Sequence, residues 1–267
     1  MRENLTTSVL IPVYANPKIE VGQLITDLAL QTYKRFDINF IYEDKSFDYD
    51  FVSFVEQYSE INEIKNTIVC LPVENNLGIG FALNFGMSKI ISDIVIRADV
   101  GDRIRNDRFA KVIKALCEND NDVVYSQANL ISSNGSHLSS YPTNLQALNY
   151  SFALKNPICH PTVAFRRKIV AELGSYDANL NFCEDLDLWL RLRKAGVRFG
   201  CVNEPLVSYV VPEKTRNKLN WRANLIVRIK NFGSPNYISS LIGILLIATY
   251  CIIPTRLKEK VYHVIKK

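Results

Sequence analysis

Apolar runs and helically spaced apolar residues alternate along the first part of the chain. Four continuous runs predict buried strands over Thr7–Tyr14, Asp37–Tyr42, Thr67–Val73 and Ile94–Ala98. Between them, apolar positions three and four residues apart predict helices over Ile19–Tyr33, Phe51–Glu60 and Ile79–Ile91. Strands that alternate with helices build βαβ units. The predicted fold class is therefore α/β, a Rossmann-like, mostly parallel sheet with helices on both faces.

The alternation is looser after Arg105. The pattern there predicts helices over Arg108–Cys117 and Cys183–Ala195, strands over Asp122–Leu130 and Val197–Val202, and a polar loop over Ser132–Ser136. Asp107 stands where it would cap the first of these helices. We expect one domain over residues 1–212, with its two halves at 1–104 and 105–212.

The C-terminal tail differs from this body in charge. Residues 213–267 hold eleven lysines and arginines against two glutamates, a net +9, so the first 212 residues carry −4 of the overall +5. Within the tail, Tyr237–Ile253 has no charged residue and basic residues flank it on both sides. Its length is near the lower limit of about 17 residues for a spanning helix. A span, a shallow or re-entrant membrane helix and a buried core helix are all compatible with that run.

Basic flanks on both sides favour a basic, apolar helical tail that attaches to the inner leaflet of the membrane. Nucleic acid is disfavoured as a partner, because the basic residues flank an apolar run instead of forming a stripe with interleaved aromatic residues. The six cysteines are scattered without zinc-type spacing, which predicts packed thiols in a reducing compartment. The N-terminal residues show no signal-peptide pattern. We expect a cytoplasmic protein, associated peripherally with the inner face of the cell membrane.

Carboxylates follow two of the predicted strands. Ligands of an open parallel sheet bind at the carboxyl ends of its strands. The sequence places Asp44 after the second predicted strand, and Asp99 and Asp102 after the fourth. Carboxylates gathered at one edge repel one another unless a cation or donor groups satisfy them. The pattern therefore predicts a divalent metal site built from hard oxygen ligands.

A second acidic group, Glu184-Asp185-Leu186-Asp187, opens a predicted helix. Acidic residues in a first helical turn are favoured by the helix dipole, which is a purely structural explanation of any one of them. A turn at Gly174–Asp177 precedes this helix, and an apolar stripe follows its first turn. The stripe would anchor the helix on the sheet while the acidic turn faces outward, which favours a functional role.

Other nucleotide and hydrolase motifs are incomplete or missing. Gly78 and Gly80 begin a dinucleotide-type fingerprint, but Leu83 stands where its last glycine or alanine is needed. The chain has no P-loop and no G-x-S-x-G, and it has only three histidines. These observations disfavour a dinucleotide-dependent enzyme, a P-loop enzyme and a Ser-His-Asp hydrolase.

Over residues 7–210 the chain resembles the family 2 inverting glycosyltransferases of the GT-A fold, in particular the bacterial branch that builds capsule, O-antigen and lipooligosaccharide. In the first half, the resemblance is carried by the opening strand Ser8–Tyr14 and by Glu43–Ser46, which stands at the family's Asp-Asp-Gly-Ser turn. It continues with Asn76, Gly78, Ala82 and Asn84, which match the family's Asn-x-Gly-x-x-x-Ala-x-Asn stretch, and with Arg97–Asp102 at its Asp-x-Asp region. In the second half, Asn156–Thr162 matches the segment before the family's acceptor site, and Glu184 and Asp185 match its Glu-Asp pair. Gly101 stands where the family's Asp-Ala-Asp-Asp has its second aspartate, which puts the metal ligand set in doubt.

The resemblance implies a role for each matching residue. Residues implied to bind the nucleotide-sugar are Pro12, Tyr14, Asp44, Asn76, Gly78, Asn84, Arg97 and Asp99. Asp102, with Asp99, is implied to hold Mn²⁺ or Mg²⁺, and Asp185, paired with Glu184, to be the catalytic base. His160 and Trp189 are implied to lie on the acceptor side, although a histidine before proline is as often structural and Trp189 also fits a core position. Arg97 is expected to pair with a neighbouring carboxylate or phosphate.

The implied reaction transfers a sugar, with inversion and metal assistance, from a nucleoside diphosphate sugar, in particular a UDP-sugar. The acceptor would be a hydroxyl of a lipid-linked or oligosaccharide chain of a growing surface glycan. Residues 1–104 would then be the nucleotide-binding half and 105–212 the acceptor half. Two other classes stay open: a sugar nucleotidyltransferase, and a non-catalytic glycan- or membrane-binding relative, which Gly101 makes plausible.

Overall fold

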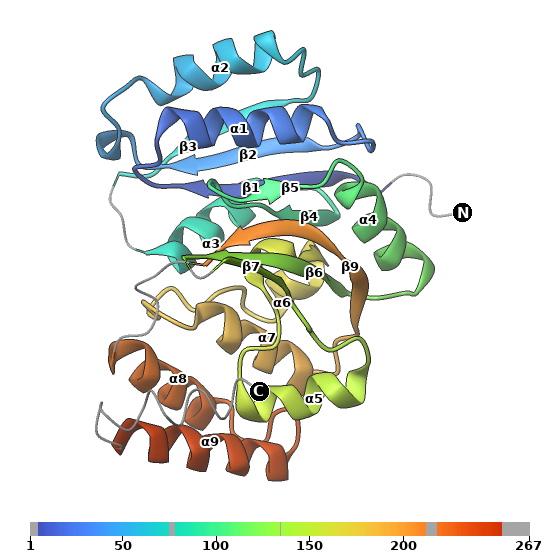
Figure 1. Cartoon of the computed structure of the whole chain (residues 1–267), viewed down its shortest axis with the longest axis vertical. Coiled ribbons are helices and arrows are strands. Elements are labelled where there is room, and N and C mark those ends of the chain that lie inside the picture. The colour runs from blue at the N-terminus through green and yellow to red at the C-terminus, as the bar shows by residue number, and fades with distance from the viewer. Residues whose placement is uncertain (1–4, 75–77, 134, 212–217, 253–267) are drawn as a thin grey trace.

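The computed structural model describes residues 5–74, 78–133, 135–211 and 218–252. Its first half is a parallel sheet in the strand order β3, β2, β1, β4 (Figure 1). The strands are β1 (Thr7–Val13), β2 (Asp37–Tyr42), β3 (Ile68–Pro72) and β4 (Ile94–Arg97), and the helices between them are α1 (Lys18–Ala29), α2 (Phe51–Ile61) and α3 (Ile79–Lys89). The predicted βαβ alternation is confirmed, and β2 has the predicted bounds.

The second half extends the same nine-stranded sheet with antiparallel and parallel pairs. Its strands are β5 (Arg103–Ile104), β6 (Val123–Ser132), β7 (Gly135–Leu138), β8 (Ala164–Arg166) and β9 (Phe199–Val210). Strand β8 runs antiparallel to β4 and to β6, whereas β9 runs parallel to β6. The helices are α4 (Arg108–Glu118), α5 (Leu145–Leu154), α6 (Arg167–Glu172) and α7 (Glu184–Lys194), and short 3-10 turns lie at Asp44–Ser46 and His160–Thr162.

Four local predictions differ from the structure. Helix α1 ends at Ala29, four residues before the predicted end at Tyr33. The polar segment predicted as a loop is a hairpin between β6 and β7, with Gly135 at φ +103° in the turn, because glycine adopts this backbone conformation without steric cost. Strand β9 continues past the polar residues and Pro205 to Val210, with a register shift against β6 near Gln127. Asp107 does not cap α4 through its side chain, because ion pairs with Arg105 and Lys111 hold that carboxylate.

Helices cover both faces of the sheet, as predicted. Successive residues of β1 point to opposite faces: Val9 and Ile11 pack in the core under α1, α2 and α4, whereas Leu10 packs in a second core with Leu83 of α3. The second core continues into α5, α6 and α7. Burial on both faces explains why the parallel strands are continuous apolar runs in the sequence.

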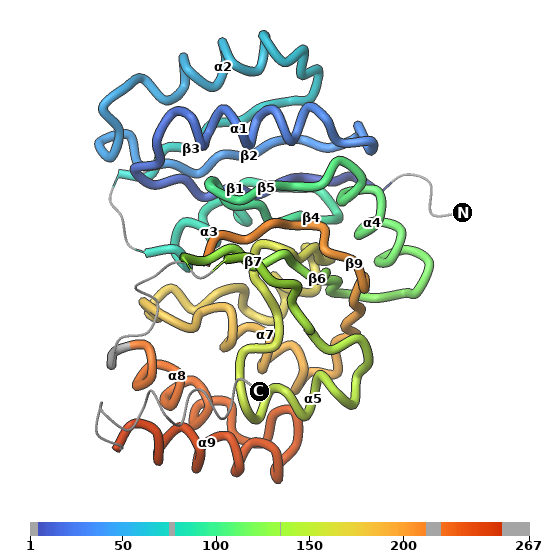
Figure 2. The backbone as a smooth tube through the Cα atoms, viewed as in Figure 1, coloured from blue at the N-terminus to red at the C-terminus, as the bar shows by residue number. Residues whose placement is uncertain are grey.

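The C-terminal segment forms two helices, α8 (Lys218–Lys230) and α9 (Tyr237–Ile252). Helix α9 packs against α5 and α8, and both C-terminal helices lie at the end of the molecule opposite α2 (Figures 1 and 2). Among the described residues, no helix has the length and apolar character needed to cross a membrane.

Candidate active site

A cavity of about 370 Å³ opens at the carboxyl ends of β1, β2 and β4. Five of the residues predicted to bind the nucleotide-sugar line it: Pro12, Tyr14, Gly78, Arg97 and Asp99. Glu43 also lines the cavity, whereas the neighbouring Asp44, also predicted to bind the donor, is not among the lining residues. The predicted contact Asn76 lies outside the described residues. The sheet edge that the sequence indicated therefore carries a cavity with these side chains around it.

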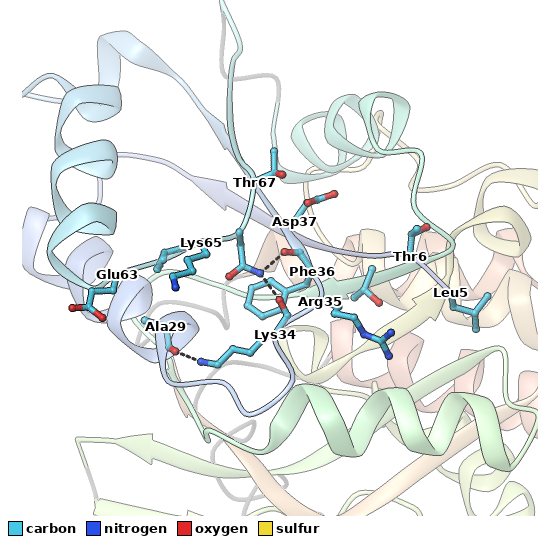
Figure 3. Close-up of a pocket in the computed structure, with 13 residues that line it drawn as sticks. Leu5, Thr6, Ala29, Lys34, Arg35, Phe36, Asp37, Glu63, Lys65 and Thr67 are labelled. Atoms are coloured by element: carbon cyan, nitrogen blue, oxygen red, sulfur yellow. Dashed lines mark hydrogen bonds between the residues drawn. The ribbon is translucent and has the colours of Figure 1, made fainter. Parts of the chain in front are cut away.

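A larger hollow of about 700 Å³ lies at the opposite edge, at the amino ends of β1, β2 and β3 (Figure 3). Polar side chains around this hollow form hydrogen bonds with the backbone of nearby segments of the chain. Lys34 donates to the carbonyl of Ala29 at 2.6 Å, and the amide of Asn66 donates to the carbonyls of Lys34 and Phe36 at 2.7 and 2.6 Å. None of the predicted site residues lines this hollow.

Arg97 and Asp99 form an ion pair at the end of β4. The guanidinium of Arg97 is fully buried, and its Nη1 lies 2.7 Å from Oδ1 of Asp99, whose side chain is 28% exposed. The structure thus gives Arg97 the carboxylate partner that was expected. A buried guanidinium of this kind fixes the orientation of the carboxylate. Asp99 is therefore held at the cavity wall.

Asp102 is buried close to this pair. Its Oδ1 accepts a hydrogen bond from the backbone N–H of Val210 at 3.0 Å, while its Oδ2 is buried and has no hydrogen-bond partner among the described residues. Burial, together with the negative charge of Asp99, raises the pKa of Asp102 to about 7. An unpartnered buried carboxylate oxygen is costly and indicates a missing ligand.

Gly101 separates the two carboxylates with φ +96°, a conformation that residues with a side chain rarely adopt. A Cβ placed there would lie 3.5 Å from Oε2 of Glu20 on α1. An aspartate at position 101 would therefore meet both backbone strain and a like charge. The positive φ and the nearby carboxylate of Glu20 therefore explain why glycine replaces the aspartate of the family's Asp-Ala-Asp-Asp pattern.

The carboxylates of Asp99 and Asp102 fit a metal that is shared with a bound diphosphate. The described residues contain no group of three or more histidines, cysteines, aspartates or glutamates arranged to hold a metal by themselves. Mg²⁺ commonly binds through one or two carboxylates and completes its shell with substrate phosphates and water. The unpartnered Oδ2 of Asp102 is suited to that arrangement.

The second acidic group lies at the start of α7. Cys183, in the left-handed region at φ +62°, turns the chain into the helix. Oδ1 of Asp185 accepts from the backbone N–H of Leu186 at 2.7 Å, and its Oδ2 accepts from the side-chain amide of Asn156 at 2.6 Å. Burial raises the pKa of Asp185, and burial with the adjacent charge of Asp185 raises the pKa of Glu184 to about 7. This carboxyl pair can therefore take up a proton near neutral pH.

The two acidic groups lie within electrostatic reach of one another. The negative charge of Asp99 contributes to the raised pKa of Glu184, while Arg97 of β4 acts to lower the pKa of both Glu184 and Asp185 on α7. The charges of Asp99, Asp102 and Asp185 all raise the pKa of Tyr209 on β9. The fold thus brings these residues near one another, although of the three aspartates only Asp99 lines the cavity.

His160, Tyr176 and Trp189 form a buried group of side chains. Nε2 of His160 lies 2.8 Å from the hydroxyl of Tyr176, and burial lowers the pKa of His160 well below its usual value, so the ring is neutral. Trp189 is fully buried, with its ring perpendicular to that of His160. Trp189 therefore takes the core position that the sequence also allowed. Neither ring presents a free surface to an acceptor.

Asn84 and Asn156 hold loops of the site. Both ends of the Asn84 amide bond the backbone of Tyr176, at 2.7 and 3.0 Å, so its side chain clamps the turn before α7 instead of facing the cavity. Asn156 enters the sequence analysis only as the first residue of the segment before the family's acceptor site, and no pattern indicates that its amide holds Asp185. That contact joins residues 29 positions apart, which only the fold brings together.

Replacing Asn156 by alanine should move the acid limb of the kcat/KM profile to higher pH. The amide donates to the ionised form of Asp185, which lowers its pKa, so removing the amide raises that pKa and delays ionisation of the base. The measurement is the pH dependence of transfer. Asn231→Ala, which removes an amide bonded to Asp187 on the same helix, is the control. An unshifted acid limb in the Asn156 variant would contradict this assignment.

The comparison with protein families identifies the class. The family model described as glycosyl transferase family 2 matches residues 8–174. The chain therefore belongs to glycosyl transferase family 2. Its fold is the GT-A type of α/β fold, shared with solved transferases.

Relatives in sequence are named bacterial polysaccharide enzymes. The chain is 31% identical over 193 residues to the amylovoran biosynthesis glycosyltransferase AmsE of Erwinia amylovora, a match that covers 71% of this chain and 70% of that protein. It is 28% identical to the UDP-Gal:alpha-D-GlcNAc-diphosphoundecaprenol beta-1,3-galactosyltransferase of Escherichia coli, over 96% of this chain and 94% of that protein. Both relatives are transferases by name, in agreement with the family of this chain.

Solved structures share the fold at low sequence identity. The mannosyltransferase PcManGT of Pyrobaculum calidifontis, in complex with GDP-Man and Mn²⁺, superposes with a TM-score of 0.67 at 15% identity, over 94% of this chain and 70% of that one. TarS of S. aureus in complex with UDP superposes with a TM-score of 0.63 at 16% identity. That match covers 85% of this chain but only 65% of the TarS chain.

Proposed function

We propose that the protein transfers a sugar from a UDP-sugar to a hydroxyl of a growing surface glycan, with inversion and with the help of Mn²⁺ or Mg²⁺. The observation that supports this proposal is the cavity at the carboxyl ends of β1, β2 and β4, lined by Asp99 and Arg97, in a family 2 chain whose Asp102 and Asp185 lie within electrostatic reach of Asp99 or its neighbours. A UDP-sugar is favoured over a GDP-sugar by the Escherichia coli relative, a UDP-Gal-dependent galactosyltransferase by name, which matches 96% of this chain.

The donor would lie in the cavity at the ends of β1 and β4. Pro12, Tyr14 and Gly78 would contact the nucleoside, and Asp99 would face the ribose and the sugar. Asp102, with Asp99, would hold the divalent metal, which neutralises charge on the departing diphosphate when it is bound. The fixed Arg97–Asp99 pair orients these groups before the donor arrives.

Asp185 would act as the base. Attack on the anomeric carbon requires the acceptor hydroxyl to lose a proton, and a carboxylate within hydrogen-bond reach can accept it. With burial raising its pKa and Asn156 holding it in place, Asp185 is a stronger base than an exposed aspartate. A base on α7 that faces the sugar from the side away from the diphosphate would give attack opposite the leaving group and therefore inversion.

The acceptor would be a lipid-linked or oligosaccharide chain at the cytoplasmic side of the membrane. All six cysteines are free thiols, which suits a reducing compartment. The basic tail would hold the enzyme peripherally on the inner face of the membrane, where lipid-linked acceptors reside.

A screen of nucleotide-sugars tests this function. The thermal midpoint is measured with UDP-, GDP- and other nucleotide-sugars, with Mn²⁺ and with EDTA. A ligand at 100 times its Kd stabilises the native state by about 2.7 kcal/mol, so a clear rise with a UDP-sugar and Mn²⁺ is expected. Stabilisation by none of them would favour the binding relative. Formation of a nucleotide-sugar from a nucleoside triphosphate and a sugar phosphate would favour the nucleotidyltransferase.

A further inference from the structure

The outward face of α9 is apolar along the whole helix. Its exposed large side chains recur one turn apart: Tyr237, Ile238, Leu241, Ile242, Leu245, Leu246 and Ile252, each 43 to 82% exposed. The side facing the body instead carries the buried residues Ser240, Gly243 and Ile247. A surface helix of a water-soluble domain normally has the opposite arrangement. No charged residue occurs within α9.

Close packing fixes this orientation of α9. A Cβ on Gly243 would lie 2.6 Å from the carbonyl oxygen of Ala153 on α5, so the two helices touch through their backbones. At the start of the helix, the hydroxyl of Ser240 accepts from the backbone N–H of Gly233 at 3.1 Å. Rotating α9 to hide its large side chains would break both contacts. The apolar face is therefore a stable feature of the surface.

Helix α8 and the residues after it add apolar and basic side chains beside α9. Exposed apolar residues here are Ile226, Ile229 and Phe232. The two helices also pack through Trp221 and Tyr250, whose ring centroids lie 4.1 Å apart. Arg222 is exposed on α8, whereas Lys230 is paired with Asp177 and Asp187. The sequence continues after α9 with Arg256, Lys258 and Lys260. A large apolar patch with basic neighbours marks an interaction surface with an anionic partner.

We propose that these exposed apolar residues of α8 and α9 form a docking surface for an anionic lipid bilayer, on which both helices lie flat. The 16-residue α9 is about 24 Å long, which is shorter than the hydrocarbon core of about 30 Å. Its contacts with α5 and α8 also leave it attached to the domain. Apolar side chains on one side and basic residues around them are typical of helices that bind in the plane of the interface.

The docking surface is joined directly to the helix that carries Asp185. The amide of Asn231 donates to Oδ1 of the buried Asp187 at 2.9 Å, and the hydroxyl of Ser234 donates to the carbonyl of Leu190 at 2.7 Å. Both bonds run from the α8–α9 connection to α7. Docking would therefore hold the base at a fixed distance from the bilayer, where a lipid-linked acceptor presents its sugar. The docking surface specifies the membrane attachment proposed above, and this consequence for the base rests on the proposed transfer reaction as well.

Vesicle binding by the full chain tests the proposal. The probes are vesicles of phosphatidylglycerol with phosphatidylethanolamine, and vesicles of phosphatidylcholine alone. The patch variant is Leu241→Glu with Leu245→Glu. The matched control is Ile61→Glu with Ile91→Glu, which places the same charges on residues that are 74% and 90% exposed on other parts of the body. Circular dichroism and the thermal midpoint establish that all three proteins are folded, and UDP titration with Mn²⁺ reports the donor site.

The proposal predicts that the native chain and the control bind anionic vesicles at least tenfold more tightly than phosphatidylcholine vesicles, and that the patch variant loses this binding at least tenfold. Equal vesicle binding by all three proteins would overturn it. A native dimer in light scattering that the patch variant abolishes, without vesicle binding, would also overturn it and assign the face to a second copy. Loss of vesicle binding with unchanged UDP affinity supports the surface. Absence of UDP binding in every protein would count against the proposed function alone.

Discussion

Replacing Asp185 by asparagine is expected to lower kcat by about 10²- to 10⁴-fold, the range that general-base catalysis contributes. Asparagine has the same shape and keeps an acceptor for the N–H of Leu186, so the start of α7 should persist. Because Asp185 is not among the residues that line the donor cavity, UDP affinity should stay within about twofold of the native value. The measurements are initial rates of transfer and calorimetric titration with UDP.

Asp177→Asn is the matched control for this variant. Asp177 lies in the turn before α7, and its carboxylate pairs with Lys230 at 2.6 Å instead of lying beside Asn156. Its replacement should leave kcat nearly unchanged. A fully active Asp185→Asn enzyme would remove Asp185 from the role of base and leave the proposed mechanism without a proton acceptor.

Replacing Asp99 or Asp102 by asparagine is expected to weaken UDP binding in the presence of Mn²⁺ by at least tenfold, and to have little effect when EDTA is present. The two carboxylates supply the protein's share of a metal shell that the diphosphate completes, so metal and nucleotide should bind together. For the same reason, Mn²⁺ without nucleotide should give no measurable binding heat. The measurement is calorimetry with each ligand alone and with both.

Asp107→Asn provides the control for the metal variants. Its carboxylate is bonded to Arg105 and Lys111, and those two basic groups hold the pKa of Asp107 at about 2. The Asp107→Asn variant should therefore bind UDP and Mn²⁺ with the same affinity as the native chain. Full Mn²⁺-dependent affinity in the Asp99 and Asp102 variants would show that another group holds the metal.

Much of the fold is predictable from the sequence, because the parallel strands β1, β2 and β4 are buried on both faces and so form continuous apolar runs. Strand β2 and helices α2, α3, α4 and α7 follow the predicted pattern within two residues. The β6–β7 hairpin and the long β9 were not predicted, because polar residues and Pro205 interrupt their alternation while cross-strand pairing still continues. The secondary structure of such segments depends on tertiary contacts, which the local sequence pattern does not show.

The residues of the site also fall into a group that the sequence predicts and a group that only the structure reveals. Residues at strand ends, such as Asp99 and Gly78, are predictable because strand ends converge at one sheet edge. The residues that pack around the site or hold its loops in place are not predictable in this way. Trp189 combines a large aromatic ring with a position next to the acidic turn, and only the structure shows that the second core buries it completely. Asn84 and Asn156 bond partners distant in the sequence, so their roles follow from the packing of α3, α7 and the loop between α5 and β8.

A crystal structure with Mn²⁺ and a non-hydrolysable analogue of the UDP-sugar donor tests the central claim most directly. We expect the diphosphate and metal on Asp99 and Asp102, with Asp185 on the other side of the sugar, facing the anomeric carbon opposite the diphosphate. The nucleotide bound instead in the hollow lined by Lys34 and Asn66, or Asp185 on the same side of the sugar as the diphosphate, would contradict the account.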